Sequence, residues 1–152
     1  LGQGLSVAIG TAQAKKLDQD KSLVYVLMGD GELQEGQVWE AAMYAAHYRM
    51  DNVIATVDYN GQQIDGPTEK IMDLMTLKAK WEAFGWEVCV VDGHNYDALL
   101  KAFTDPQTKP RVIIAQTIKG KGVDFMEGKA EWHHKVPSDE QYEQALEQLG
   151  KQ

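Results

Sequence analysis

The sequence contains a single cysteine, Cys89, so it cannot form an internal disulfide. One unpaired thiol is typical of a reducing compartment, and we predict a cytoplasmic location. Cys89 lies in the apolar stretch 86–91, which predicts a buried structural thiol rather than a reactive one. No apolar run reaches the roughly 18 residues of a membrane span, and no signal peptide is visible, so no membrane partner is expected.

Positive charge is also scarce relative to negative charge. The formal net charge is −8, which argues against a nucleic-acid partner or an anionic membrane surface. Apolar residues make up 43% of the 152 residues, so the length and composition allow one domain, 1–152, with a real core. The phosphate-binding pattern Gly-x-x-x-x-Gly-Lys-Ser/Thr is absent, and we interpret Lys119, Lys121 and Lys129 as solvated loop lysines, with contact of one of them to a sugar phosphate as the alternative.

Apolar, β-branched runs alternate with helix-like segments along the chain. This alternation predicts an α/β fold with a mainly parallel sheet and helices on both faces. The polar loop 119–137 is unusually long for a compact domain, which is often a sign of function. A shorter loop follows the turn signal Asn60-Gly61. The predicted strands are 23–28, 53–59, 87–91 and 111–117, and the predicted helices are 5–16, 35–50, 74–84, 96–103 and 139–149.

Two oxygen-bearing side chains follow the first two predicted strands. Asp30 lies in Gly29-Asp30-Gly31 after the first strand, and Asn60 closes the second. Because parallel strands present their carboxyl ends at one edge of a sheet, these side chains are expected to meet there. A carboxylate, an amide and a nearby carbonyl suit Mg²⁺, and the glycines let backbone N–H groups approach a phosphate. The sequence therefore predicts a Mg²⁺-diphosphate site, unless Asp30 is simply a cap and Asn60-Gly61 a simple turn.

Five sequence blocks together resemble the thiamine-diphosphate-binding domain of transketolase. They occur in the family's order and span nearly the whole chain. The resemblance implies the thiamine-diphosphate-binding fold and a transferase of the pentose phosphate pathway that moves a two-carbon ketol unit from a ketose phosphate to an aldose phosphate. It also implies two cofactors, thiamine diphosphate and Mg²⁺ (or Ca²⁺ or Mn²⁺). The blocks are residues 1–4, 29–36, 58–66, 117–122 and 132–133.

The resemblance assigns ligands residue by residue. Asp30, Asn60 and the main-chain carbonyl of Gln62 correspond to the family's metal ligands. The diphosphate oxygens and a water would complete an octahedral set. Gly31 would offer its backbone N–H to the diphosphate, and Gly29 belongs to the same cofactor-binding turn.

Further positions correspond to residues near the cofactor. Ile64 would pack against the cofactor rings, although ordinary loop packing is the alternative. Leu1 and Gly2 fall in a loop that lies near the aminopyrimidine in relatives. Glu35 corresponds to a glutamate that joins an acidic network across the family's subunit interface, linking two cofactor sites. Its alternative is a solvated glutamate in the first turn of a helix.

The histidines have different predicted roles. Transketolases carry a histidine after this last strand that contacts the diphosphate and lies near the substrate. The spacing from Trp132 favours His133 as the catalytic and cofactor-binding residue, with His134 as the alternative. His47 is predicted to be a packing or surface residue on a helix. His94 is predicted to belong to a turn and helix start.

A partner is expected because the resemblance covers only half of an active site. In the family, a separate pyrimidine-binding domain contacts the aminopyrimidine, and no segment here corresponds to it. We favour a natural amino-terminal subunit of a split transketolase, lacking its upstream part, over a fragment of a longer enzyme. It would work in a homo- or hetero-oligomer with a pyrimidine-binding subunit or domain. An exposed apolar face is expected around Val38, Trp39 and Ala42, since the family's dimer contact runs along this helix.

Three other functions remain as alternatives. The first is another enzyme on the same cofactor fold, such as deoxyxylulose-phosphate synthase or a 2-oxo acid dehydrogenase component. Trp132-His133 and the block from Gly29 to Gly36 favour transketolase over these. The second is a non-catalytic subunit that binds the cofactor. The third is a metal-dependent phosphohydrolase, which would require a second carboxylate cluster that the sequence does not offer.

Overall fold

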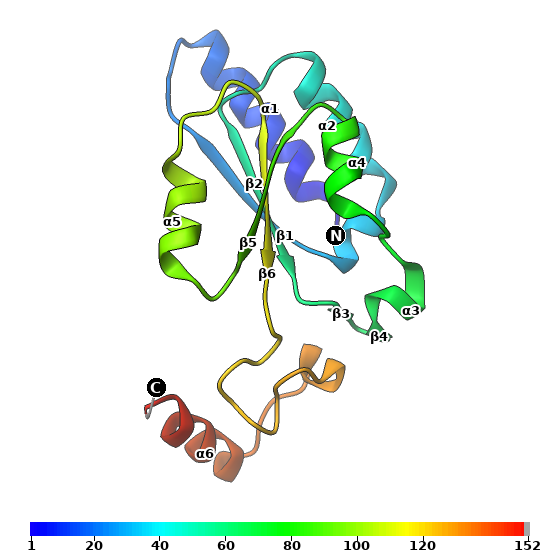
Figure 1. Ribbon diagram of the computed structural model, residues 1–152, viewed down its shortest axis with the longest axis vertical. Helices are drawn as coiled ribbons and strands as arrows, with labels where there is room; N and C mark the ends of the chain where they lie inside the picture. Colours follow the sequence, from blue (N-terminus) through cyan, green and yellow to red (C-terminus); the bar gives the residue numbers. More distant parts are fainter. Residues whose placement is uncertain (151–152) are drawn as a thin grey trace.

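The structure, a computed structural model, describes residues 1–150. Its centre is a four-stranded sheet in the order β1-β2-β6-β5, in which all neighbouring strands are parallel. The two central strands, β2 and β6, are the most buried and are rich in Val and Ile, whereas the edge strand β1 exposes Tyr25 and Leu27 on one face. The predicted α/β class is confirmed, and each strand boundary lies within one residue of its predicted position. The strands are β1 (Val24–Gly29), β2 (Val53–Tyr59), β5 (Glu87–Asp92) and β6 (Arg111–Gln116) (Figure 1).

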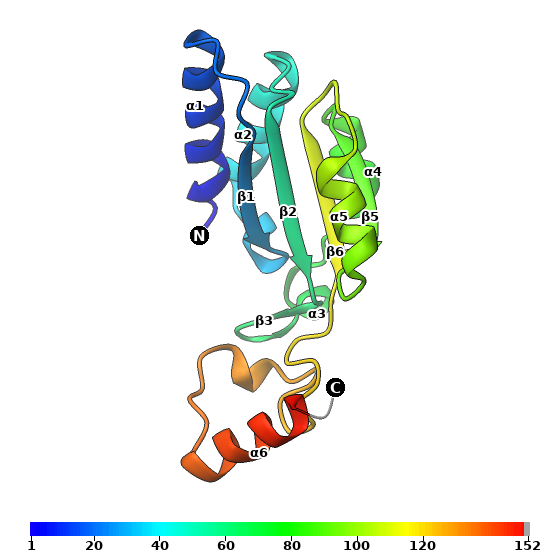
Figure 2. The same ribbon diagram turned by 90° about the vertical axis from the view of Figure 1, so that its left-hand side faces the viewer.

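Helices cover both faces of the sheet, as predicted. One face carries α1 (Gln3–Leu17), α2 (Gly36–His47) and α4 (Leu77–Ala83), and the other carries α5 (Tyr96–Thr104) (Figures 1 and 2). The larger cluster of buried residues lies under the three helices. Burial of this apolar area is the main source of stability.

The predicted exposed apolar face on α2 is wrong. Val38 and Ala42 are completely buried, and Trp39 packs in an aromatic cluster with Trp81 at 5.1 Å between ring centroids. The apolar stripe of an amphipathic helix faces the core, and here that core also receives Trp86, whose Nε1 donates to the Ala42 carbonyl at 2.9 Å. Any partner contact along α2 must therefore use its outer side.

Two boundaries of α2 also differ from the prediction of 35–50. Glu35 has an extended backbone with ψ 126° and is the N-cap, so the helix begins at Gly36. Arg49 has a positive φ of 49°, which ends the helix before Met50. The helix predicted at 74–84 is shorter, at Leu77–Ala83, and is followed by Gly85 with φ 88°, as expected for a residue after a helix end.

The loop after Asn60 is more structured than predicted. It contains a short antiparallel hairpin, β3 (Gln62–Gln63) and β4 (Gly66–Pro67), followed by helix α3 (Thr68–Met72). Two-residue strands lack the period-2 pattern from which longer strands are recognised. The hairpin holds Gln62 and Ile64 close to the end of β2.

Arg111 connects the sheet to the helix α5 that covers its second face. It is 1% exposed, and its guanidinium donates to Glu87 Oε1 on β5 at 2.6 and 3.0 Å. It also donates to the carbonyls of Ala102, Asp105 and Pro106 at 2.9, 2.7 and 2.8 Å. A planar guanidinium with several donors is suited to such multiple bonding. Arg111 therefore joins the end of α5 and the following loop to the sheet.

Cys89 lies on this same face. It is partly buried rather than fully buried, and it packs against the cluster formed by Ile54, Ala102 and Ile113. Burial raises the pKa of the Cys89 thiol. A raised pKa keeps the thiol protonated, which agrees with the predicted structural role.

The chain after β6 leaves the sheet at its carboxyl end (Figures 1 and 2). This segment contains the 3-10 helix η2 (Ala130–His133) and helix α6 (Asp139–Leu149). The predicted capping box of α6 is confirmed, because Ser138 Oγ accepts from the Gln141 N–H and Gln141 Oε1 accepts from the Ser138 N–H. Within residues 1–150, no helix combines the length and apolar character needed to cross a membrane.

Candidate functional site

Asp30 joins the ends of β1 and β2. Its side chain is 1% exposed, with Oδ1 accepting from the Gly31 N–H at 2.7 Å and Oδ2 from the Gly61 N–H at 2.6 Å. Its own N–H donates to the Asp58 carbonyl at 3.2 Å. The carboxyl ends of β1 and β2 were predicted to lie together, and the Asp30 carboxylate connects them.

Asn60 lies directly beside this junction. Its Oδ1 accepts from the Gln62 N–H at 2.9 Å, and its Nδ2 donates to Asp58 Oδ2 at 2.9 Å. Asp30, Asn60 and Gln62 are thus brought into one short segment of the carboxyl edge. Their oxygens are hard ligands, which suit Mg²⁺ or Ca²⁺ rather than a soft transition metal.

The electrostatics of this edge also fit a cation. The pKa of Asp30 is raised by burial and, to a lesser extent, by the nearby Asp58 charge, against the hydrogen bonds from Gly61 and Gly31. A bound cation would offset that cost of burying a carboxylate. In the part of the chain described by the structure, no group of three or more His, Cys, Asp or Glu could hold a metal. A metal ion here would thus be held by the single Asp30 carboxylate together with amide and carbonyl oxygens, and the phosphohydrolase alternative gains no support.

The raised pKa of Asp30 predicts a pH dependence. A proton would compete with the predicted metal ion for this carboxylate, so Mg²⁺ affinity should fall as pH drops through a pKa above the ordinary 3.8. The folding stability of the metal-free chain changes with pH in the opposite direction to the Mg²⁺ affinity, because the folded state binds the Asp30 proton more tightly than the unfolded state does. The Asp30 contribution to stability is present below 3.8 and is lost as pH rises through the raised pKa.

Calorimetric titration of Mg²⁺ with thiamine diphosphate at several pH values would measure this effect. The variants His133→Gln and His134→Gln serve as controls, since they remove the two imidazole side chains carried by the loop that contacts the β3–β4 hairpin. An affinity that stays constant as the pH is lowered from about 7.5 to the ordinary carboxyl pKa of 3.8, in protein that remains folded, would contradict the prediction.

Glu32 connects the start of the chain to this site. One carboxylate oxygen accepts from the Gly2 N–H at 2.7 Å and the other from the Gly29 N–H at 3.3 Å. Gly2 has φ 77°, and a Cβ there would lie 2.7 Å from the Glu35 Cβ, so the position requires glycine. Leu1 is 86% exposed, and its carbonyl accepts from Gln37 at 3.2 Å. The Glu32 contact was not predicted, since its partner lies 30 residues away in sequence.

Gly31 lets the backbone after β1 approach the Gln63 side chain closely. An added Cβ would lie 3.0 Å from the Cβ of Gln63, which belongs to the β3–β4 hairpin. The hairpin is held there by a hydrogen bond from Gln34 Nε2 to Gln63 Oε1 at 2.6 Å. Gly29, in contrast, has open space around such a Cβ. The close contact with Gln63 therefore requires a residue without a side chain at Gly31, but not at Gly29.

The long loop brings η2 against the β3–β4 hairpin. His133 is the last residue of η2 and His134 is its C-cap, and both side chains are exposed. Trp132 anchors them, because its Nε1 donates to the Phe125 carbonyl at 2.8 Å and its ring lies 4.6 Å from the Lys135 ammonium. Both predicted histidine candidates thus lie on the segment that faces the hairpin.

The other predicted residues have varied surroundings. Ile64 is 56% exposed between β3 and β4, and Glu35 is exposed at the N-cap of α2, beside Gly2. His47 is an exposed residue in the last turn of α2, which agrees with its predicted surface role. His94 lies in the turn before α5, as predicted, and its Nε2 accepts from the Ile118 N–H at 2.8 Å.

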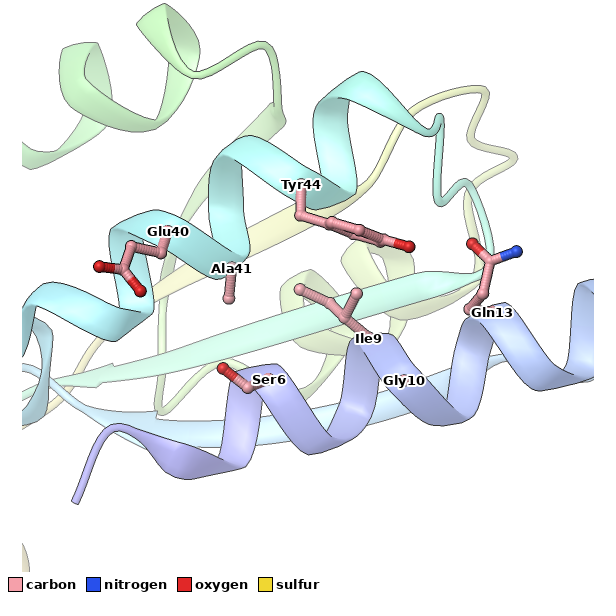
Figure 3. A pocket seen from close by; sticks show the side chains of 7 residues that line it. All are labelled: Ser6, Ile9, Gly10, Gln13, Glu40, Ala41 and Tyr44. Carbon is pink, nitrogen blue, oxygen red and sulfur yellow. The ribbon is translucent and has the colours of Figure 1, made fainter.

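The surface also contains a hollow of about 380 Å³ between α1 and α2 (Figure 3). Figure 3 shows the Tyr44 ring above Ile9 and Gly10, with Glu40 and Ser6 at one end. These residues are distinct from the predicted site residues. A second hollow of about 270 Å³ is lined partly by Gly61 and Gln62 and so adjoins the predicted metal ligands.

These features define an α/β protein with an oxygen-rich, glycine-bordered site at the carboxyl edge of a parallel sheet, the edge where such folds bind ligands. Residues 1–152 match the family described as transketolase, thiamine diphosphate binding domain. The chain belongs to this family.

Relatives and solved structures agree with this assignment. The chain is 45% identical to one subunit of an apulose-4-phosphate transketolase of Phocaeicola vulgatus, covering 98% of this chain and 54% of the relative. It is 46% identical to a 6-deoxy-6-sulfo-D-fructose transketolase subunit of a Clostridium species, covering 100% and 56%. The crystal structure of Campylobacter jejuni transketolase superposes with a TM-score of 0.89 at 36% identity, covering 99% of this chain and 25% of that one. The chain thus spans about half the length of the two subunit relatives.

Proposed function

We propose that this chain supplies the Mg²⁺-diphosphate half of a transketolase-type active site. The reaction would transfer a two-carbon ketol unit from a ketose phosphate to an aldose phosphate. The observation that carries the proposal is the buried carboxylate of Asp30, which accepts from Gly31 and Gly61 at the junction of β1 and β2. Family membership supports thiamine diphosphate as the cofactor.

Each residue would have a limited task. Asp30, Asn60 and the Gln62 carbonyl would hold the metal ion. The Gly31 N–H, which donates to Asp30 Oδ1 in this structure, would exchange that hydrogen bond for one to the diphosphate. The chemistry supplied by the bound cofactor is stabilisation of a carbanion at the former ketose carbonyl carbon. Protein groups orient the reactants and manage protons around that centre.

The cofactor's ring end would be held by other residues. Ile64 is half exposed near the hairpin and would pack on the rings, with Leu1 and Gly2 nearby. His133, with its neighbour His134 as the alternative, would contact the diphosphate and move a proton near the substrate. Glu35 would join an acidic network with a partner subunit, next to Gly2.

A partner is part of the proposal. Two relatives are named as subunits of transketolases, and the chain covers about half of each. We propose that a pyrimidine-binding subunit or domain completes the site in a homo- or hetero-oligomer, in the cytoplasm. On α2, the side open to a partner includes Met43 and Tyr44, which are 54% and 42% exposed.

Two linked measurements test this function. Calorimetric titration of thiamine diphosphate into the chain should give saturable binding with Mg²⁺ and none with EDTA. Addition of a pyrimidine-binding transketolase partner should then give ketol transfer above that of the partner by itself. The donor panel would contain xylulose 5-phosphate and the two sugars that name the relatives, apulose 4-phosphate and 6-deoxy-6-sulfofructose.

The outcomes separate the alternatives. Binding without transfer by any assembled complex would favour the non-catalytic subunit. Turnover of a 2-oxo acid in place of a ketose would favour another enzyme class on this fold. Lack of cofactor binding both alone and with the partner would contradict the proposal.

A further inference from the structure

Asp58 uses both of its carboxylate oxygens inside the candidate site. It lies one residue before the end of β2, where Oδ2 accepts from Asn60 Nδ2 at 2.9 Å and Oδ1 accepts from the hydroxyl of Thr117. Thr117 directly follows β6, the neighbour of β2 in the sheet. The two strands are thus linked through this carboxylate just beside the predicted metal ligands.

The chemistry of a carboxylate fixes the direction of the Asn60 amide. An ionised carboxylate can only accept hydrogen bonds, so Asn60 must present its NH₂ group to Asp58. The amide oxygen then faces the other way, where it accepts from the Gln62 N–H at 2.9 Å. A metal ligand must present oxygen rather than NH₂. The hydrogen bond to Asp58 therefore excludes the flipped orientation of the Asn60 amide, in which the NH₂ group would take the place of the oxygen.

Thr117 is itself held in place from two sides. Its N–H donates to the Tyr59 carbonyl at 3.2 Å. On the other side, a Cβ added at Gly93 would overlap the Thr117 Cγ2 methyl, so the turn after β5 packs closely on it. The Gly93 N–H donates to the Gln116 carbonyl at 2.8 Å, which fixes that turn. The orientation of the Thr117 hydroxyl is therefore set by the sheet.

We propose that Asp58 and Thr117 are positioning residues that fix the Asn60 amide with its oxygen toward the metal ion. The inference rests on the proposed function, because it concerns the same metal site. It adds two residues that hold a ligand without contacting the metal themselves. Outer residues of this kind typically change metal affinity by about 10- to 100-fold when replaced.

Asp58→Asn and Thr117→Val test this role. An asparagine at 58 both donates and accepts, so it no longer dictates the Asn60 orientation, and valine keeps the shape of Thr117 without its hydroxyl. We expect Mg²⁺ affinity at saturating thiamine diphosphate to fall about 10- to 100-fold for Asp58→Asn and less for Thr117→Val. Thr117→Ser, which keeps the hydroxyl, should stay within about 2-fold of the wild type.

Two further readouts distinguish positioning from general stability. Thermal unfolding of the free variants shows whether each remains folded at the titration temperature. The side-chain amide signals of Asn60 in ¹⁵N NMR spectra, assigned by their loss in Asn60→Asp, should shift in Thr117→Val but not in Thr117→Ser. This readout requires neither cofactor nor partner.

The possible failures are distinct. If the wild type does not bind Mg²⁺ and thiamine diphosphate even with a partner, the proposed function fails. If the wild type binds and folded Asp58→Asn and Thr117→Val bind equally well, the positioning role is overturned while the function stands. Should Asp58→Asn not fold, Thr117→Val and its serine control still decide the question.

Discussion

Replacing Asp30 by alanine is expected to abolish Mg²⁺-dependent binding of thiamine diphosphate. Asp30 supplies the charged ligand of the predicted set, and it also holds the Gly31 and Gly61 N–H groups at 2.7 and 2.6 Å. Without it, both the metal ligands and the glycine turn lose their common anchor. We expect the affinity to fall by more than about 100-fold, beyond the usual effect of residues outside the metal's ligands. Calorimetric titration of the cofactor with Mg²⁺ measures this directly.

The matched control is Asp92→Ala. Asp92 ends β5 at the same edge of the sheet, and its Oδ1 accepts from the His94 N–H at 2.8 Å. This variant also removes a turn-capping aspartate, but one outside the predicted ligand set. Its cofactor affinity should remain near that of the wild type. Binding by a folded Asp30→Ala protein with wild-type affinity would contradict the predicted metal site, and Asp30→Asn, which is closer in shape, provides a second test.

Replacing Arg111 by alanine is expected to lower the free energy of unfolding by about 3 to 5 kcal/mol. The guanidinium is 1% exposed and makes two hydrogen bonds to Glu87 and three to backbone carbonyls. Its removal leaves one buried acceptor, the Ala102 carbonyl, and several partly buried ones without this donor, and it frees the end of α5. Since domains of this kind are stable by only about 5 to 15 kcal/mol, the loss is a large fraction of the total. Urea unfolding followed by far-ultraviolet circular dichroism measures it.

Lys101→Ala is the control for Arg111. Lys101 pairs with Asp105 on the same helix at 2.6 Å, but its side chain is 73% exposed. An exposed pair is worth at most about 1 kcal/mol, so the change should be small. Arg111→Lys should recover only part of the stability, because an ammonium cannot reproduce the planar set of donors. Equal unfolding free energies for Arg111→Ala and Lys101→Ala would show that the buried cluster is not required.

The sheet was predictable because its strands carry a strong local signal. Runs such as 53–59 and 111–117 are rich in Val and Ile, which buried parallel strands require. The same logic placed Asp30 and Asn60 at strand ends, and the structure brings them together through Gly61. The capping box at Ser138 was predictable because it depends on residues only three positions apart.

Other features depend on contacts between distant residues and carried no local signal. The hydrogen bonds of Glu32 to Gly2 and of Asp58 to Thr117 join positions 30 and 59 residues apart. The exposed face expected around Val38, Trp39 and Ala42 came from the family's dimer contact along this helix. The sequence could not correct it, because an apolar stripe looks the same whether a partner or the chain itself covers it. Only the three-dimensional arrangement of α2 on the sheet distinguishes these cases.

The arrangement of the aromatic residues gives this protein two separate optical reporters. Trp39, Trp81 and Trp86 form one cluster, with ring centroids 5.1 and 4.8 Å apart, and Trp39 Nε1 donates to the Leu33 carbonyl just after the Asp30 turn. Trp132, the remaining tryptophan of the four, lies in the loop that carries His133. Trp132→Phe should therefore leave a fluorescence signal from the core alone. The difference between its emission and that of the wild type is the contribution of Trp132. Changes in the loop that carries Trp132 can therefore be observed separately from changes in the core.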